Sequence, residues 1–105
     1  MAQFDVWHNP DPASAERIPY LVELQHDLHD GLDTVLVAPL TEAMHYGRPA
    51  IERLQPLLDF EGGRYVLLTP ELAGVPRRRL KNKAGQVPAE RAALLAALDC
   101  LITGF

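Results

Sequence analysis

Alternating apolar and polar residues predict three short strands in the first part of the chain. Gln3–Trp7 has the alternation of a half-buried strand, and Tyr20–Gln25 repeats it. Thr34–Ala38 is more apolar and is followed by Pro39, which we expect to close the strand. Turn-forming residues at Asp30–Asp33 separate the second strand from the third. The pattern predicts an antiparallel meander.

The connections carry fewer periodic signals. His8–Arg17 contains two prolines and little apolar content, which predicts an exposed, mobile loop able to face a partner. Glu42–Tyr46 predicts one helical turn that ends before Gly47.

A hairpin is predicted further along. Leu57–Phe60 and Arg64–Thr69 flank Glu61–Gly63, whose glycines permit a positive φ, and Pro70 stops the second strand.

The last segment predicts a helix over Val87–Ile102. It is rich in alanine and leucine, Pro88 suits a first helical turn, and Gly104 permits a left-handed exit. An apolar stripe at helical spacing is expected to pack on the sheet. Its members are Leu94, Leu98, Leu101 and Phe105, with Leu95 and Ile102 beside them. The fold class is therefore α+β and mainly β: a small antiparallel sheet with a C-terminal helix.

Length and composition narrow the class of protein. At 105 residues with 48% hydrophobic and 23% charged residues, the sequence predicts one globular domain over residues 1–105. No apolar run approaches the ~20 residues of a membrane span, and the first residues lack a secretory pattern. A lone cysteine, Cys100, forms no internal disulfide, so we expect a cytoplasmic protein without a membrane partner.

The charge is unevenly distributed. Residues 1–76 hold 4 basic and 12 acidic residues, a net −8, whereas residues 77–105 hold 6 basic and 2 acidic, a net +4. An acidic surface disfavours general nucleic-acid binding. The run Arg77–Lys83 has three interpretations: a solvated edge or loop, a site for an acidic peptide, or direct contact with DNA phosphates.

Catalytic and metal chemistry receive little support. His26–Asp30 is the densest set of potential metal ligands, but on a strand His26 and His29 would point to opposite faces. Cys100, with His8 or His45 as a base, falls on an apolar helix where a neutral thiol is usually buried. We therefore expect no catalytic residue, no metal and no cofactor.

The order and spacing of these segments resemble the CcdB family, toxins of toxin–antitoxin modules that poison DNA gyrase. The resemblance is carried by Gln3-Phe4-x-Val6, Leu21-Val22-x-Leu24-Gln25-x-Asp27, Pro39-Leu40, Leu54-x-Pro56, Thr69, Ala73-x-Val75-Pro76 and Gly104. It implies an SH3-like antiparallel sheet with a terminal helix, assembled as a two-fold homodimer. It also implies a CcdA-like antitoxin with an acidic tail, and repression of the module's promoter, with DNA contacted only through the antitoxin complex.

The resemblance assigns gyrase binding to Thr103, Gly104 and Phe105, where the family has Trp-Gly-Ile and stacks the tryptophan on the catalytic subunit of gyrase. Threonine does not stack, so this position departs from the family. For Gly104, target contact and helix capping both fit. The basic residues Arg77, Arg78 and Arg79, in a segment that is often acidic in the family, are the candidate antitoxin site.

Two functions follow from the resemblance. The first is a gyrase-poisoning toxin that is neutralised by its antitoxin. The second is a homologue on the same fold that binds antitoxin and regulates transcription, but has lost the gyrase contact with its tryptophan.

Overall fold

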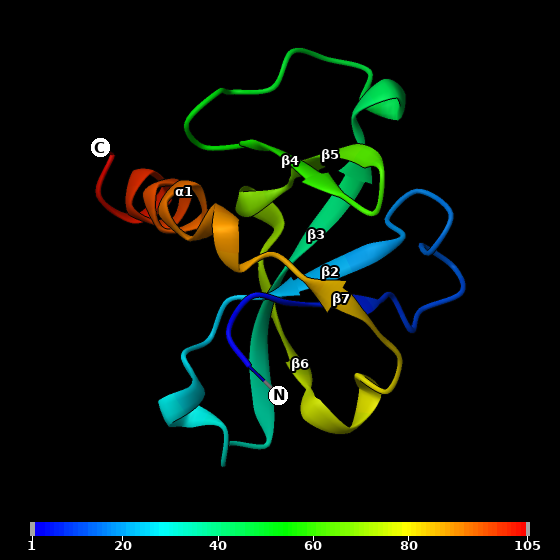
Figure 1. Ribbon diagram of the computed structural model, residues 1–105, viewed down its shortest axis with the longest axis vertical. Coiled ribbons are helices and arrows are strands. Elements are labelled where there is room, and N and C mark those ends of the chain that lie inside the picture. Colours follow the sequence, from blue (N-terminus) through cyan, green and yellow to red (C-terminus); the bar gives the residue numbers. More distant parts are fainter. Residues whose placement is uncertain (1, 105) are drawn as a thin grey trace.

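A computed structural model describes residues 2–104 as a curled, seven-stranded antiparallel sheet with one α-helix at its side (Figure 1). The strand order is β4-β5-β3-β2-β1-β7, and β6 pairs with β3 beside this path. The strands are β1 (Asp5–His8), β2 (Tyr20–Glu23), β3 (Thr34–Glu42), β4 (Leu57–Phe60), β5 (Gly63–Leu67), β6 (Ala73–Pro76) and β7 (Lys83–Gln86). The helix is α1 (Arg91–Thr103), and the 3₁₀ turns are η1 (Asp27–His29), η2 (Ala43–His45), η3 (Thr69–Glu71), η4 (Arg77–Arg79) and η5 (Pro88–Glu90). The predicted class, α+β and mainly β with an SH3-like sheet, is confirmed.

The predicted meander is present. Val6 of β1 faces Val22 of β2, and Val22 faces Ala38 of β3, in two antiparallel pairings. The hairpin is also as predicted: Phe60 of β4 faces Gly63 of β5.

The prediction that Pro39 closes the third strand is wrong, because β3 continues through it to Glu42. The outer side of β3 pairs with β6 up to Val37 and with β5 from Leu40 onward. The Pro39 carbonyl accepts a hydrogen bond from Leu68 N (2.8 Å) on this side, so its missing N–H falls where β3 changes partner. No ladder bond is lost there.

The sequence did not predict β6 and β7. Both are short, contain glycine and pair with distant strands, β6 with β3 and β7 with β1. Gly85 of β7 lies under the Phe60 ring, whose Cε1 would be 2.8 Å from a Cβ at this position. A larger residue would therefore force the Phe60 ring or β7 to shift.

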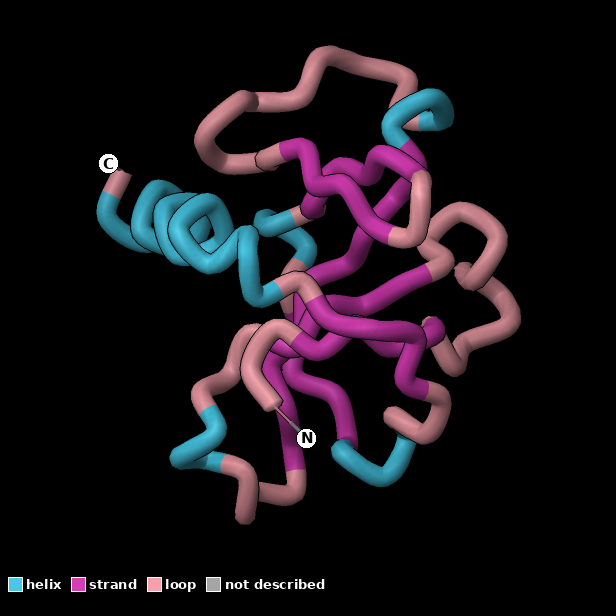
Figure 2. The backbone as a smooth tube through the Cα atoms, viewed as in Figure 1, coloured by secondary structure: helices cyan, strands magenta, loops and turns pink. Residues whose placement is uncertain are grey.

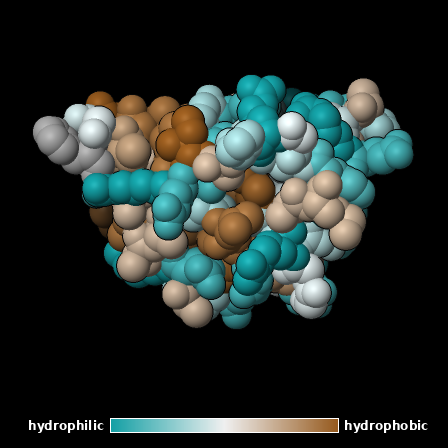
Figure 3. All heavy atoms as spheres, turned by 90° about the horizontal axis from the view of Figure 1, so that it is seen from above, coloured by the Kyte–Doolittle hydropathy of each residue, from teal (hydrophilic) through white to brown (hydrophobic). Residues whose placement is uncertain are grey.

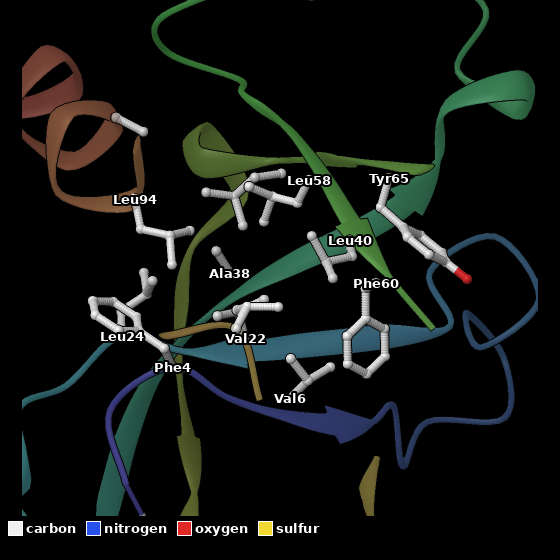
Figure 4. Packing of buried hydrophobic residues seen from close by; sticks show 13 residues of the cluster. Phe4, Val6, Val22, Leu24, Ala38, Leu40, Leu58, Phe60, Tyr65 and Leu94 are labelled. Atoms are coloured by element: carbon white, nitrogen blue, oxygen red, sulfur yellow. The ribbon is translucent and has the colours of Figure 1, made fainter. Parts of the chain in front are cut away.

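The core lies on both faces of the sheet. The larger cluster joins β1, β2 and β3 to β4, β5 and α1, and Figure 4 shows Val22, Leu40, Phe60 and Leu94 converging on it. On the opposite face, Trp7 packs with a second cluster that includes Leu21, Val35, Val37 and Leu80. The prediction of a half-buried first strand is therefore wrong: Asp5, Val6 and Trp7 are all buried.

The helix stands beside the sheet, and its C-terminal end projects away from it (Figure 2). Pro88 lies in η5, one turn before α1 begins at Arg91. Only Leu94 and Ala97 are buried, so the predicted stripe packs through its first part while Ile102 is 77% exposed. Within residues 2–104, no helix is long and apolar enough to span a bilayer.

The loop from Asn9 to Ile18 is held by its own side chains. Asn9 Nδ2 donates to Ser14 Oγ (3.0 Å) and to the Ile18 carbonyl (2.9 Å), and Asp11 accepts bonds from Ala13 N and Ser14 Oγ. The loop is exposed over most of its length, as predicted, but it has a defined internal structure.

Candidate functional site

The end of α1 presents the first two residues of the predicted gyrase-binding tripeptide. Gly104 has φ 84° and donates its N–H to the Cys100 carbonyl at 3.0 Å, so it caps the helix in the left-handed conformation. Thr103 Oγ1 donates to the Asp99 carbonyl at 2.7 Å. Both residues are exposed, and Phe105 lies outside the described residues.

Gly104 is required by the backbone and not by crowding. A Cβ at this position would meet no atom within 4 Å, but its φ is one that other residues rarely adopt. The capping interpretation of Gly104 is therefore confirmed.

Apolar side chains collect over α1. Figure 3 shows hydrophobic atoms gathered on the helix near the C-terminal end of the chain. The sequence of α1 is RAALLAALDCLIT, which holds two charged residues, Arg91 and Asp99. Most side chains of α1 are apolar and only Leu94 and Ala97 are buried, so the helix leaves apolar surface exposed.

The basic run contains side chains with different roles. The Arg77 guanidinium donates from Nε to the Leu32 carbonyl (2.8 Å) and from Nη1 to Asp30 Oδ1 (3.1 Å), and lies 3.9 Å from Glu23 Oε2. Its side chain is 19% exposed. Arg78 and Arg79 are exposed. Arg77 therefore ties the turn to the body of the protein, whereas Arg78 and Arg79 face solvent.

Two buried carboxylates on the same face of the sheet were missed by the sequence analysis. Glu23 Oε1 accepts a hydrogen bond from Trp7 Nε1 (3.2 Å), and Asp5 Oδ1 lies 3.2 Å from Lys83 Nζ. Burial raises the pKa of Glu23, and the Trp7 hydrogen bond and the nearby Arg77 charge partly oppose the rise. The available signal was the position of Glu23 inside an otherwise apolar strand.

This burial predicts a pH-dependent effect of Glu23→Gln. The folded state binds a proton on Glu23 at pH values where the unfolded chain, with a pKa near 4.5, is already ionised. Stability from this group is therefore lost as pH rises between the two pKa values. The uncharged glutamine can still accept the Trp7 hydrogen bond. The unfolding free energy of Glu23→Gln minus that of wild type should therefore be larger near pH 7 than near pH 4. Urea denaturation at the two pH values measures this difference. An advantage that shrinks as pH rises would contradict this assignment.

The histidines do not lie as predicted. His26 and His29 flank and end the 3₁₀ turn η1 instead of lying on a strand, and His26 Nδ1 accepts the Leu28 N–H at 2.9 Å. Within residues 2–104, no group of three or more His, Cys, Asp or Glu side chains is placed to hold a metal ion.

The candidate catalytic pairs are not formed. Cys100 is partly buried on α1 and makes no hydrogen bond to a histidine within the described part of the chain. The His8 ring packs against Tyr20, with centroids 5.3 Å apart, and His45 Nδ1 lies 3.1 Å from Glu42 Oε2.

The structure is that of a small α+β protein with a projecting, largely apolar helix capped by Gly104 and a basic turn at Arg77–Arg79. The family model described as CcdB protein matches residues 3–104. The chain therefore belongs to the CcdB family, which consists of toxins of toxin–antitoxin systems and is not an enzyme family. No curated protein matches the sequence.

Proposed function

We propose that residues 1–105 form one toxin domain that binds the catalytic subunit of DNA gyrase and stabilises its cleaved complex with DNA. The protein acts in the cytoplasm as a homodimer and is neutralised by a CcdA-like antitoxin. It performs no chemistry of its own. The protein inhibits gyrase by binding its cleaved complex with DNA, which is otherwise short-lived.

The observation that carries this proposal is the exposed end of α1 in a chain of the CcdB family. Ile102 is 77% exposed, and Gly104 ends the helix in a left-handed turn with open space around it. An apolar projection of this kind supports docking into another protein.

A two-fold dimer fits this arrangement. The sheet buries only part of the apolar surface of α1. In a two-fold dimer, the same apolar surface of a second copy could pack against the remainder. Two helix ends placed about one axis would match the two-fold symmetry of a dimeric gyrase cleavage domain.

The basic turn supports the antitoxin part of the proposal. Arg78 and Arg79 are exposed and suit an acidic tail, with contact to DNA made only through the antitoxin complex that represses the promoter. Arg77, which is bonded to Asp30 and Leu32, contributes by fixing the turn.

Induced expression tests the toxin function. In the host's own cells without antitoxin, growth should stop and linear DNA should accumulate, because a trapped gyrase complex leaves double-strand breaks. Expression of the chain ending at Asp99 is the matched control and should be harmless. Normal growth with the intact protein would contradict the proposal.

A second function, a homologue that binds antitoxin and regulates transcription without poisoning gyrase, is favoured by one observation. Thr103 has a small side chain whose hydroxyl is bonded to the Asp99 carbonyl. It therefore offers a partner no flat ring.

Thr103→Trp tests whether this end of the helix is the gyrase contact. A large ring at the exposed helix end should tighten gyrase binding by at least about tenfold, since aromatic anchors dominate many interfaces. Thr103→Ala, which removes the hydroxyl bond without adding a ring, is the control and should change affinity by less than about threefold. The measurement is titration calorimetry with the gyrase cleavage domain. If the tryptophan variant does not bind more tightly than wild type, this end of the helix is not the gyrase contact.

A further inference from the structure

The segment 77–83 crosses from β6 to β7 and packs on the second core cluster, the apolar face around Trp7 (Figure 1). Its side chain Leu80 is buried in this cluster with Val35 and Val37. The other residues of the segment are exposed or only partly buried. One buried leucine therefore seats the segment on the sheet, and we call residues 77–83 the strap.

Backbone hydrogen bonds hold the strap at its ends. Arg77 N donates to the Asp33 carbonyl at 2.8 Å. The Asn82 carbonyl accepts from His8 N at 2.9 Å. Leu80 N bonds within the strap itself, to the Arg77 carbonyl at 3.1 Å. The middle of the strap thus makes no backbone hydrogen bond to any other described segment of the chain.

An ion pair fastens the strap where it enters β7. Lys83 Nζ lies 3.2 Å from Asp5 Oδ1, and the Asp5 side chain is 2% exposed. Asp5 Oδ2 accepts the Ala2 N–H at 2.8 Å, whereas Oδ1 accepts no hydrogen bond within residues 2–104. The Lys83 ammonium is therefore the group that compensates a buried negative charge on β1. If the strap moves away, water can solvate this carboxylate instead.

The charge of the strap favours its release. Arg77, Arg78, Arg79, Lys81 and Lys83 place five basic groups within seven residues. Among residues 2–104, no acidic group pairs with the middle three, Arg78, Arg79 and Lys81. Like charges at this spacing repel one another, and a released, hydrated strap separates them. The closed position therefore depends on Leu80 and on the contacts at the two ends.

We propose that the strap opens as one local unit while the rest of the sheet stays folded, and that the Lys83–Asp5 ion pair holds it closed. Opening withdraws Leu80 from the second core cluster and exposes the apolar side chains of Trp7 and Leu21, which pack with it. Segments with few buried contacts open at a lower free energy than the whole domain. The inference concerns the fold alone and is independent of gyrase binding.

Native-state hydrogen exchange of the wild-type protein, followed by NMR at low urea concentrations, tests for the local unit. The amides of Arg77, Leu80 and His8 should share one opening free energy with little dependence on urea, because a local opening exposes little surface. The reference is the Leu24 amide, which donates to the Leu36 carbonyl at 2.9 Å in the middle of the sheet. It should be better protected and should lose protection steeply as urea rises.

Substitutions at the ion pair test what holds the strap closed. Lys83→Met leaves the buried Asp5 carboxylate without its counterion and should speed exchange of the three amides by about tenfold. Lys81→Met removes an unpaired charge from the same strap and is the matched control, with a change of less than about twofold. Asp5→Asn combined with Lys83→Met removes the buried charge as well and should return exchange to within about threefold of wild type.

Trypsin gives a second measurement of the same opening. Cuts after Arg78 and Arg79, identified by mass spectrometry, should quicken in Lys83→Met by the factor seen in exchange, since the protease cleaves the open strap. Three results would each overturn the inference. They are strap amides as sensitive to urea as Leu24 in wild type, an effect of Lys83→Met no larger than that of Lys81→Met, and no rescue by Asp5→Asn. The wild-type exchange decides alone if circular dichroism shows that a variant is unfolded.

Discussion

Replacing Arg77 by alanine is expected to lower the free energy of unfolding by about 3 kcal/mol. The substitution removes donors to the Leu32 carbonyl and to Asp30, and it takes away the positive charge near the buried Glu23 carboxylate. The loss is large because a carboxylate that is 2% exposed keeps its desolvation cost when its partner disappears. Urea denaturation at neutral pH measures it.

Arg78→Ala is the matched control, since the side chain next along the turn is exposed. Its unfolding free energy should stay within about 0.5 kcal/mol of wild type. Arg77→Lys keeps the charge but loses the forked donor geometry, so an intermediate loss is expected. Equal stabilities for Arg77→Ala and Arg78→Ala would show that the buried charge network does not stabilise the fold.

Leu94→Ala should cost about 2–5 kcal/mol of unfolding free energy. Leu94 is fully buried and, with Ala97, joins α1 to the main core cluster, close to Leu24 and Ala38 in Figure 4. Removing its side chain leaves a cavity between the helix and the sheet. Denaturant unfolding, followed by circular dichroism, gives the value.

Leu28→Ala makes the same chemical change at a side chain that is 80% exposed. It should change stability by less than about 0.5 kcal/mol. If Leu94→Ala were as stable as Leu28→Ala, the helix would not be anchored where the structure places it.

Local patterns were sufficient for much of this fold. The hairpin was predicted because Gly62 and Gly63 permit a positive φ, which the structure has at Gly62 (77°) and also at Glu61 (50°). The helix was predicted from alanine and leucine content and from the glycine that ends it. Both elements are specified by neighbouring residues, so the sequence alone is informative.

Non-local elements were missed for a physical reason. The strands β6 and β7 have weak intrinsic strand preference and exist because β3 and β1 offer them an edge. Pro39 was misjudged because its missing N–H matters only where a partner strand needs it, and β3 changes partner at that residue. Whether these segments pair therefore depends on the neighbouring strands in the folded sheet and not on their own sequence.

The candidate site was likewise predictable from local sequence only in part. Capping by Gly104 follows from the helix signal, whereas the separate roles of Arg77, Arg78 and Arg79 depend on which side chains the fold brings near them. Three identical residues in a row carry no local sign that the first binds Asp30 and faces Glu23.

Calorimetric titration of the purified protein into the dimeric cleavage domain of gyrase from its own host tests the central claim most directly. The toxin function predicts heat that saturates at about one protein dimer per target dimer, because in the proposed complex the two-fold axes of both would coincide. A flat trace at high concentration would contradict it and would identify the protein as an antitoxin-binding homologue that no longer poisons gyrase.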